Sequence, residues 1–153
     1  MTQKEKVVCA MCGTKDTIWK THDMIEVYGK PYCEKCIVKV IDEEEKNIIF
    51  STTCNLEGYK VVEYLGVESA EVVPGTGIFS EAFSGFSDTF GGRSTAFETK
   101  LSAARVQVFK MMTLIALKKG ANAIIGIDLD YTEFSSNRVG VICNGTFVRV
   151  DKG

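Results

Sequence analysis

Four cysteines near the N-terminus are the residues whose type and spacing most directly indicate chemistry. They form two pairs, Cys9-x-x-Cys12 and Cys33-x-x-Cys36, with twenty residues between the pairs. Each Cys-x-x-Cys makes a tight knuckle that directs two thiolates toward one point, and two such pairs supply the closed tetrahedral sulfur shell of a structural zinc. We therefore expect one Zn²⁺ per chain, bound by all four. A closed shell leaves no position for water or substrate, so it predicts a structural cofactor and no catalysis.

Redox chemistry and disulfide formation are the alternatives for these cysteines. A thioredoxin-like site uses one Cys-x-x-Cys at the end of a strand in a βαβ setting, which residues 1–45 lack. Residues 1–6 are charged and have no signal-peptide core, so we expect a cytoplasmic chain, in a reducing compartment that favours metal over disulfides. His22, the single histidine, could replace one cysteine as a ligand, but we expect it at the surface.

The charge balance argues against a nucleic-acid partner. The chain has 18 Lys and Arg residues against 20 Asp and Glu residues, and neither the part before Asn47 nor the part after it has the basic excess that phosphate neutralisation requires. The longest apolar stretch, residues 111–117, is interrupted by Thr113. It is far shorter than the roughly 20 residues that a bilayer crossing needs, so we expect no membrane span.

Residues 1–45 are expected to form a small zinc-ribbon-like or treble-clef-like module. A Gly-containing turn within residues 27–32 predicts a hairpin that delivers the second knuckle, and residues 37–41 predict a short helix with one apolar face. The positive end of that helix would stabilise the neighbouring thiolates. Because about forty residues cannot form a sufficient core, zinc should decide whether the module folds.

Residues 46–153 are expected to form a second unit, an α+β domain with an antiparallel sheet covered on one face by helices. Strands are predicted at residues 48–50, 59–73, 123–131 and 139–150. Two helices are predicted between the second and third strands: one carries the aromatic stripe Phe79, Phe83, Phe86 and Phe90, and the other runs over residues 94–119 and ends at Gly120, with Thr95 and Glu98 as a capping box.

The longer helix has apolar residues on two sides. One side is enough to cover a sheet, so the second predicts a further helix or another subunit on the far side. The first stripe is Phe97, Leu101, Ala104, Val108, Met111 and Ile115, and the second is Val106, Phe109, Met112 and Ala116.

Catalytic motifs are not found in the sequence. It has no Gly-x-Ser-x-Gly elbow, Walker loop or His-Glu-x-x-His pair. Asp128 and Asp130 alternate along a predicted strand and share a face, which could resemble a carboxylate pair. Two acids on one strand more often face solvent or cap a helix, so we interpret the chain as non-enzymatic and keep an enzyme as the minority alternative.

Gly91-Gly92-Arg93-Ser94 is the best candidate for a ligand site away from the cysteines. Glycines let the backbone approach a ligand, the helix that follows presents free N–H groups, and Arg93 adds a forked cation, so a small anion could bind there. Asp128 or Asp130 could complete the pocket. The alternative is a tight turn between helices, with Arg93 paired to one of these carboxylates or to a neighbouring subunit.

Five short motifs follow one another in the second part of the chain: Ser51-Thr-Thr53, Leu56-Glu-Gly58, Val61-Val-Glu-Tyr-Leu-Gly66, Gly91-Gly-Arg-Ser94 and Gly120-Ala-Asn-Ala-Ile-Ile-Gly-Ile-Asp-Leu-Asp-Tyr131. Together they resemble the YbjQ family, which carries a heavy-metal-binding label. The resemblance spans about residues 50–150, with the four-cysteine module as an N-terminal fusion. It implies a dodecin-like α+β subunit that assembles into rings, as a pentamer or a pair of pentamers. Within it, Cys54 and Cys143 are the only cysteines, and we expect both to be small buried hydrophobic side chains.

Two functional hypotheses follow. The first is a non-enzymatic, zinc-containing homo-oligomeric binding protein whose ring carries a metal or a small anionic ligand. The alternative is a structural or adaptor assembly, in which the ring multiplies the zinc modules and so increases avidity for a protein partner.

Overall fold

The computed structural model describes residues 7–15, 24–73, 93–134 and 138–153, and all structural statements refer to these residues. The chain is a mixed α+β protein, as the sequence predicts. Its elements are β1 (Ile25–Val27), β2 (Lys30–Tyr32), α1 (Glu34–Glu44), a 3₁₀ turn η1 (Glu45–Asn47), β3 (Ile49–Phe50), β4 (Tyr59–Val72), α2 (Arg93–Lys119), β5 (Ala123–Phe134) and β6 (Arg138–Lys152).

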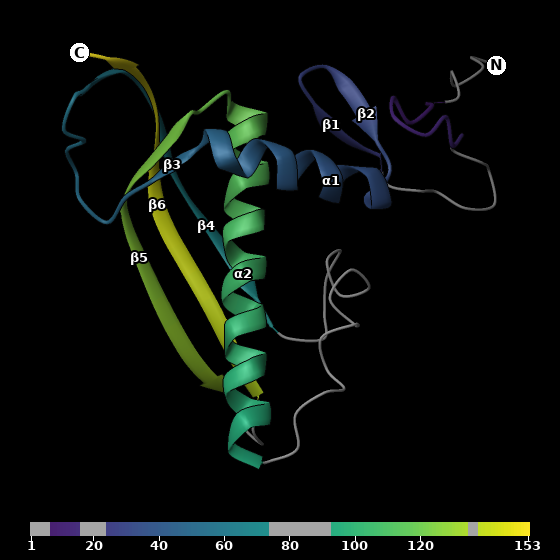
Figure 1. Cartoon of the computed structure of the whole chain (residues 1–153), viewed down its shortest axis with the longest axis vertical. Helices are drawn as coiled ribbons and strands as arrows, with labels where there is room; N and C mark the ends of the chain where they lie inside the picture. The colour runs from purple at the N-terminus through teal and green to yellow at the C-terminus, as the bar shows by residue number, and fades with distance from the viewer. Residues whose placement is uncertain (1–6, 16–23, 74–92, 135–137) are drawn as a thin grey trace.

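The main sheet has the strand order β3-β5-β6-β4. The three long strands are antiparallel, which confirms the predicted sheet, whereas the two-residue β3 runs parallel to β5. Helix α2 crosses one face of this sheet (Figure 1). None of the described helices combines the length and hydrophobicity needed to cross a bilayer.

Alternation along β6 separates two apolar clusters. Cys143 and Phe147 are fully buried in the cluster that includes α2. Val148 and Val150 belong to a second cluster with Leu56 from the loop that follows β3. Because neighbouring residues of a strand point to opposite faces, the second cluster lies on the face away from α2. The loop thus covers part of the sheet that the helix cannot reach.

Helix α2 agrees with the predicted long helix but begins earlier. It includes Arg93, so Thr95 lies inside the helix and is not its N-cap. Its end is as predicted, because Gly120 takes a left-handed φ of 72°, which glycine adopts at little cost. Beyond it, the Asn122 side chain donates to the Val150 carbonyl and accepts from the Val150 N–H, both at 2.8 Å, and so joins the helix end to β6.

The two predicted stripes of α2 are divided differently in the structure. Met112 was assigned to the far side, yet its Cε lies 3.4 Å from where a side chain at Gly145 of β6 would begin, so Met112 faces the sheet. Val106 is 44% exposed. A second covered side does exist, and it contains Leu114 and Leu117.

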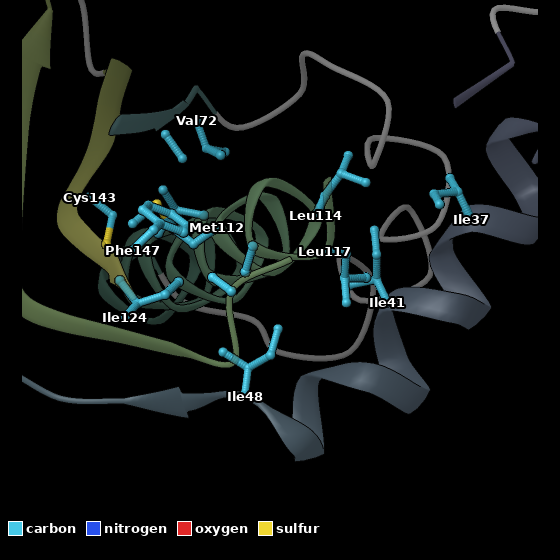
Figure 2. Close-up of a cluster of buried hydrophobic side chains, with 14 of the residues drawn as sticks. Ile37, Ile41, Ile48, Val72, Met112, Leu114, Leu117, Ile124, Cys143 and Phe147 are labelled. Carbon is cyan, nitrogen blue, oxygen red and sulfur yellow. The ribbon is translucent and has the colours of Figure 1, made fainter. Parts of the chain in front are cut away.

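Helix α1 covers this second side. Its fully buried Ile37 and Ile41 belong to the same apolar cluster as Leu114 and Leu117, and Figure 2 shows Ile41 beside Leu117. The predicted apolar face of α1 is therefore confirmed, and it packs onto the rest of the chain. The predicted aromatic helix over residues 79–90 lies outside the described residues, and the boundary between residues 45 and 46 stays a prediction.

Candidate metal centre

The first knuckle is a tight turn between Cys9 and Thr14. The Cys9 N–H donates to the Thr14 carbonyl at 2.9 Å, and the Gly13 N–H donates to the Cys9 carbonyl at 3.0 Å. Gly13 has a φ of 72°, a conformation that favours glycine. The turn bends the chain back on itself, so Cys9 and Cys12 lie on the same side of it.

The second knuckle follows the β1–β2 hairpin. Tyr28 and Gly29 form its turn with φ values of 53° and 70°, the left-handed pair that a two-residue hairpin loop requires. The hairpin ends directly before Cys33, which is the N-cap of α1, and Cys36 lies in the first turn of that helix. The chain therefore delivers the second pair of thiols at the positive end of a helix dipole.

Backbone hydrogen bonds hold the two knuckles together. The Ala10 N–H donates to the Pro31 carbonyl at 2.8 Å, and the Cys33 N–H donates to the Cys9 sulfur at 3.4 Å. The sequence gives no signal for either contact, because each joins residues more than twenty positions apart. These two contacts join the knuckles and bring the two thiol pairs next to each other.

The four sulfur atoms of Cys9, Cys12, Cys33 and Cys36 lie within 4.8 Å of one another. The Cys12 and Cys33 sulfurs are 3.7 Å apart, close to the roughly 3.8 Å edge of a tetrahedron with zinc–sulfur distances of about 2.3 Å. All six cysteines of the chain are outside disulfides. The predicted cluster is therefore present, with Cys12 exposed and the other three buried.

The surroundings of the sulfurs act on their pKa values in different directions. Burial opposes ionisation of Cys9, but N–H groups of Cys12, Cys33 and Met11 outweigh it and lower the pKa of Cys9 to about 6. The Thr14 hydroxyl, 3.1 Å from the Cys12 sulfur, lowers the pKa of Cys12. Burial, reinforced by the neighbouring thiols, raises the pKa of Cys36 to about 12. A divalent cation would remove this conflict, because it deprotonates the thiols that coordinate it.

The tentative anion site is only partly described. Gly91 and Gly92 lie outside the described residues, as do the side chains of Arg93 and Ser94. Asp128 and Asp130 are exposed on β5, opposite Asn144 and Ile142 of β6. They follow a bulge between Ile125 and Asp128 and share one face of the strand, as the alternation predicts. The structure does not test their predicted relationship to Arg93. His22 also lies outside the described residues.

The two remaining cysteines have opposite environments. Cys143 is fully buried, as predicted, and burial raises its pKa to about 11, with a further contribution from the Asp128 carboxylate. Cys54 was also expected to be buried, and this was wrong: it is exposed in the polar loop after β3. In this loop the hydroxyl groups of Ser51 and Thr53 form a hydrogen bond, with their oxygens 2.7 Å apart. Among the described residues, the four N-terminal cysteines form the only group of three or more potential ligands.

Comparison with known proteins identifies the larger part of the chain. The model of the family YbjQ_1, described as "Putative heavy-metal-binding", matches residues 48–151. The chain belongs to the YbjQ family. A UPF0145 protein from Carboxydothermus hydrogenoformans is 38% identical to it, over 68% of this chain and 97% of that protein. A UPF0145 protein from Bacillus cereus is also 38% identical, over 67% of this chain and 100% of that protein.

A solved structure is also similar. It is a crystal structure of a DUF74-family protein of unknown function from Pediococcus pentosaceus, with 13% identity and a TM-score of 0.37 over 68% of this chain and 98% of that one.

The YbjQ match and the cysteine cluster occupy different parts of the chain. The matched range begins at residue 48, after all four clustered cysteines, and it contains Cys54 and Cys143 as its cysteines and no histidine. The heavy-metal description of the YbjQ family therefore refers to a segment without the ligand group seen here. The four sulfurs of the metal centre lie outside the range that the family model matches.

Proposed function

We propose that this chain is a non-enzymatic, zinc-containing homo-oligomeric binding protein of the cytoplasm. The observation that carries the proposal is the group of four sulfurs within 4.8 Å of one another, contributed by two knuckles. Zn²⁺ suits it because it accepts four thiolates in a tetrahedral shell, whereas Mg²⁺ and Ca²⁺ prefer oxygen ligands. Bound zinc would be structural, since all four positions are filled by protein.

Metal analysis of freshly purified full-length protein tests the zinc proposal. We expect one zinc per chain in the wild type and less than about a tenth of that in Cys33→Ser, because a three-thiolate site binds far more weakly. Cys54→Ser is the matched control, since it also removes one thiol and should retain all the zinc. Wild-type protein without stoichiometric zinc would reject the proposal. Stoichiometric copper or iron in place of zinc would show that the site binds a different thiophilic metal.

The oligomer is supported by apolar side chains that the single chain leaves exposed. Tyr64 and Val67 of β4 are each 69% exposed, and Val106 of α2 is 44% exposed. β4 is also an edge strand of the sheet, and long exposed edges with apolar residues are usually covered. We propose a ring of five chains, or two such rings. Light scattering that returns the monomer mass of 16.8 kDa would contradict it.

A small anionic ligand is the cargo that we propose for this ring, with Gly91, Gly92, Arg93 and Ser94 lining its pocket and Asp128 or Asp130 nearby. A charge-assisted contact contributes about 1.5 to 3 kcal/mol, so Arg93→Ala should weaken binding by about ten- to a hundredfold. Isothermal titration with inorganic phosphate measures this, and light scattering shows whether the ring stays intact. Loss of the ring would assign Arg93 to assembly.

An adaptor role is the second candidate, and one observation favours it. Val7, Val8 and Met11 around the first knuckle are 43%, 38% and 46% exposed, although apolar side chains in so small a module would contribute most if buried. A ring would present several copies of this surface and raise its avidity for a protein partner. Native mass spectrometry of protein isolated from its host separates the two roles: unexplained small mass supports cargo, and a stoichiometric second protein supports the adaptor.

A further inference from the structure

Helix α1 belongs both to the metal centre and to the core of the YbjQ domain. Its N-cap is Cys33 and its first turn contains Cys36. On the next positions of the same helix, Ile37 and Ile41 are fully buried in the cluster that contains Leu117 of α2. Figure 2 shows this contact from α1 across to α2. One helix of 11 residues therefore carries both the cysteines and the apolar contact with α2.

Helix α1 is poorly stabilised by its own sequence. Isolated helices shorter than about 12 residues are marginal in water. No side chain caps its N-terminus, and its last turn has no basic residue. Asp42, Glu43 and Glu44 instead place negative charge at the negative end of the helix dipole, which is unfavourable. The ion pair between Asp42 and Lys110 of α2 offsets one of these charges. The fold of α1 must therefore depend on its tertiary contacts: the cysteine cluster at its start, the buried Ile37 and Ile41, and the ion pair of Asp42.

We infer that metal occupancy of the four-cysteine site controls the packing of α1 on α2, so that the module acts as a metal-responsive switch on the YbjQ domain. The ligand is a thiophilic divalent cation, and the inference rests on the proposed zinc site. Bound metal would fix the N-terminal turn of α1 through Cys33 and Cys36. Without it, the first turn loses its anchor, α1 loosens, and Leu114 and Leu117 become uncovered.

The metal is accessible to exchange from one side. Cys9, Cys33 and Cys36 are buried, whereas Cys12 is exposed. A chelator or a competing thiol can therefore approach through Cys12 without unfolding the module first. This open side distinguishes the site from a fully enclosed structural zinc, and it gives the switch a route for gaining and losing its ion.

Hydrogen exchange of the full-length chain, zinc-loaded and after removal of zinc by a chelator, tests the inference. On zinc removal, we expect amides of residues 34–44 and of residues 112–117 to exchange at least about tenfold faster, because both helices lose a shared contact. Amides of residues 142–148, in the centre of β6, should not change. Re-addition of zinc alone should restore the slow exchange, whereas Mg²⁺ should not.

Two variants keep the test decisive. Ile41→Ala removes part of the apolar contact between α1 and α2. Amide exchange over residues 112–117 should therefore already be faster in the zinc-loaded variant than in zinc-loaded wild type, and chelation should change it less. Cys54→Ser should behave as wild type. If the chain binds stoichiometric zinc but its removal speeds amide exchange in residues 34–44 alone, the switch is overturned and the zinc proposal stands. A chain that binds no zinc would overturn both.

Discussion

Lys110 of α2 forms an ion pair with Asp42 of α1, and this contact joins the cysteine module to the helix that covers the sheet. The Lys110 side chain is 13% exposed and that of Asp42 is 50% exposed. Asp42 directly follows the buried Ile41 in the second half of α1, so the pair holds the C-terminal half of the helix while the cysteines lie at its N-terminal end.

Neutralising two adjacent acids of α1 should change stability in opposite directions. Asp42→Asn removes the ion pair with Lys110 and should lower the free energy of unfolding by about 0.5 to 1 kcal/mol, the range for partly exposed pairs. Glu43→Gln removes an unfavourable charge from the helix end and should raise it by about 0.3 to 0.5 kcal/mol. Urea denaturation of the zinc-loaded proteins measures both. Equal destabilisation by the two changes would show that the pair has no specific role.

Thiol labelling should distinguish the two cysteines of the YbjQ domain. In zinc-loaded protein at pH 8, iodoacetamide should modify Cys54 within minutes and leave Cys143 unmodified. Cys143 is fully buried, and with a pKa of about 11 only about one thiol in a thousand is ionised at that pH. Mass spectrometry of peptides identifies the modified residue. Rapid modification of Cys143 would show that the sheet opens readily.

The raised pKa of Cys143 also predicts a loss of stability at alkaline pH. In the unfolded chain the thiol ionises near its ordinary value of 9.0, whereas in the fold it ionises near 11. The unfolded state therefore releases this proton first, and the contribution of Cys143 to stability should fall as pH rises from about 9 to about 11. Cys143→Ala should unfold with a weaker pH dependence over this interval. An unchanged dependence would assign the effect to other groups.

A methyl group at residue 145 should not fit between the sheet and α2. The first side-chain atom at Gly145 would lie 2.6 Å from Cγ2 of Ile124 and 3.4 Å from Cε of Met112, so Gly145→Ala should destabilise the fold by about 1 to 3 kcal/mol through overpacking. Gly120→Ala is a useful comparison, because nothing lies within 4 Å there and the cost should be limited to about 1 kcal/mol of backbone strain. Thermal unfolding compares them. An unchanged unfolding temperature for Gly145→Ala would contradict the packing between β6 and α2.

A charge at residue 106 should act on assembly and not on folding. Val106 is 44% exposed on α2, so Val106→Asp should leave the circular dichroism spectrum unchanged. If the ring covers this residue, burying the carboxylate is unfavourable and the oligomer should dissociate. Light scattering measures the mass, and Lys118→Asp, also on an exposed position of α2, is the control. A ring that tolerates Val106→Asp would place the subunit interface elsewhere.

Local patterns in the sequence determined the cysteine cluster and most of the elements. A Cys-x-x-Cys knuckle needs only a tight turn to bring its own two thiols together, and two such pairs are the ligand set of a four-thiolate metal site, so spacing was sufficient to predict Cys9, Cys12, Cys33 and Cys36. The backbone contacts that join the two pairs were not predictable in this way. The stop at Gly120 and the alternation of β6 are equally local, since they depend on backbone conformation and on a period of two. The order of motifs was also enough to indicate the YbjQ family.

Contacts between distant segments were decided only by the tertiary structure. Periodicity shows which sides of α2 are apolar, but it does not say which element covers them. Met112 therefore faces β6 against expectation, and α1 covers Leu117. Cys54 is exposed in the loop after β3, whose Ser51 and Thr53 carbonyls accept hydrogen bonds from the Ile127 and Gly126 N–H groups of β5. The parallel pairing of β3 with β5 joins residues more than seventy positions apart. Such pairings depend on how chain segments meet in space, and a local sequence window contains no information about that.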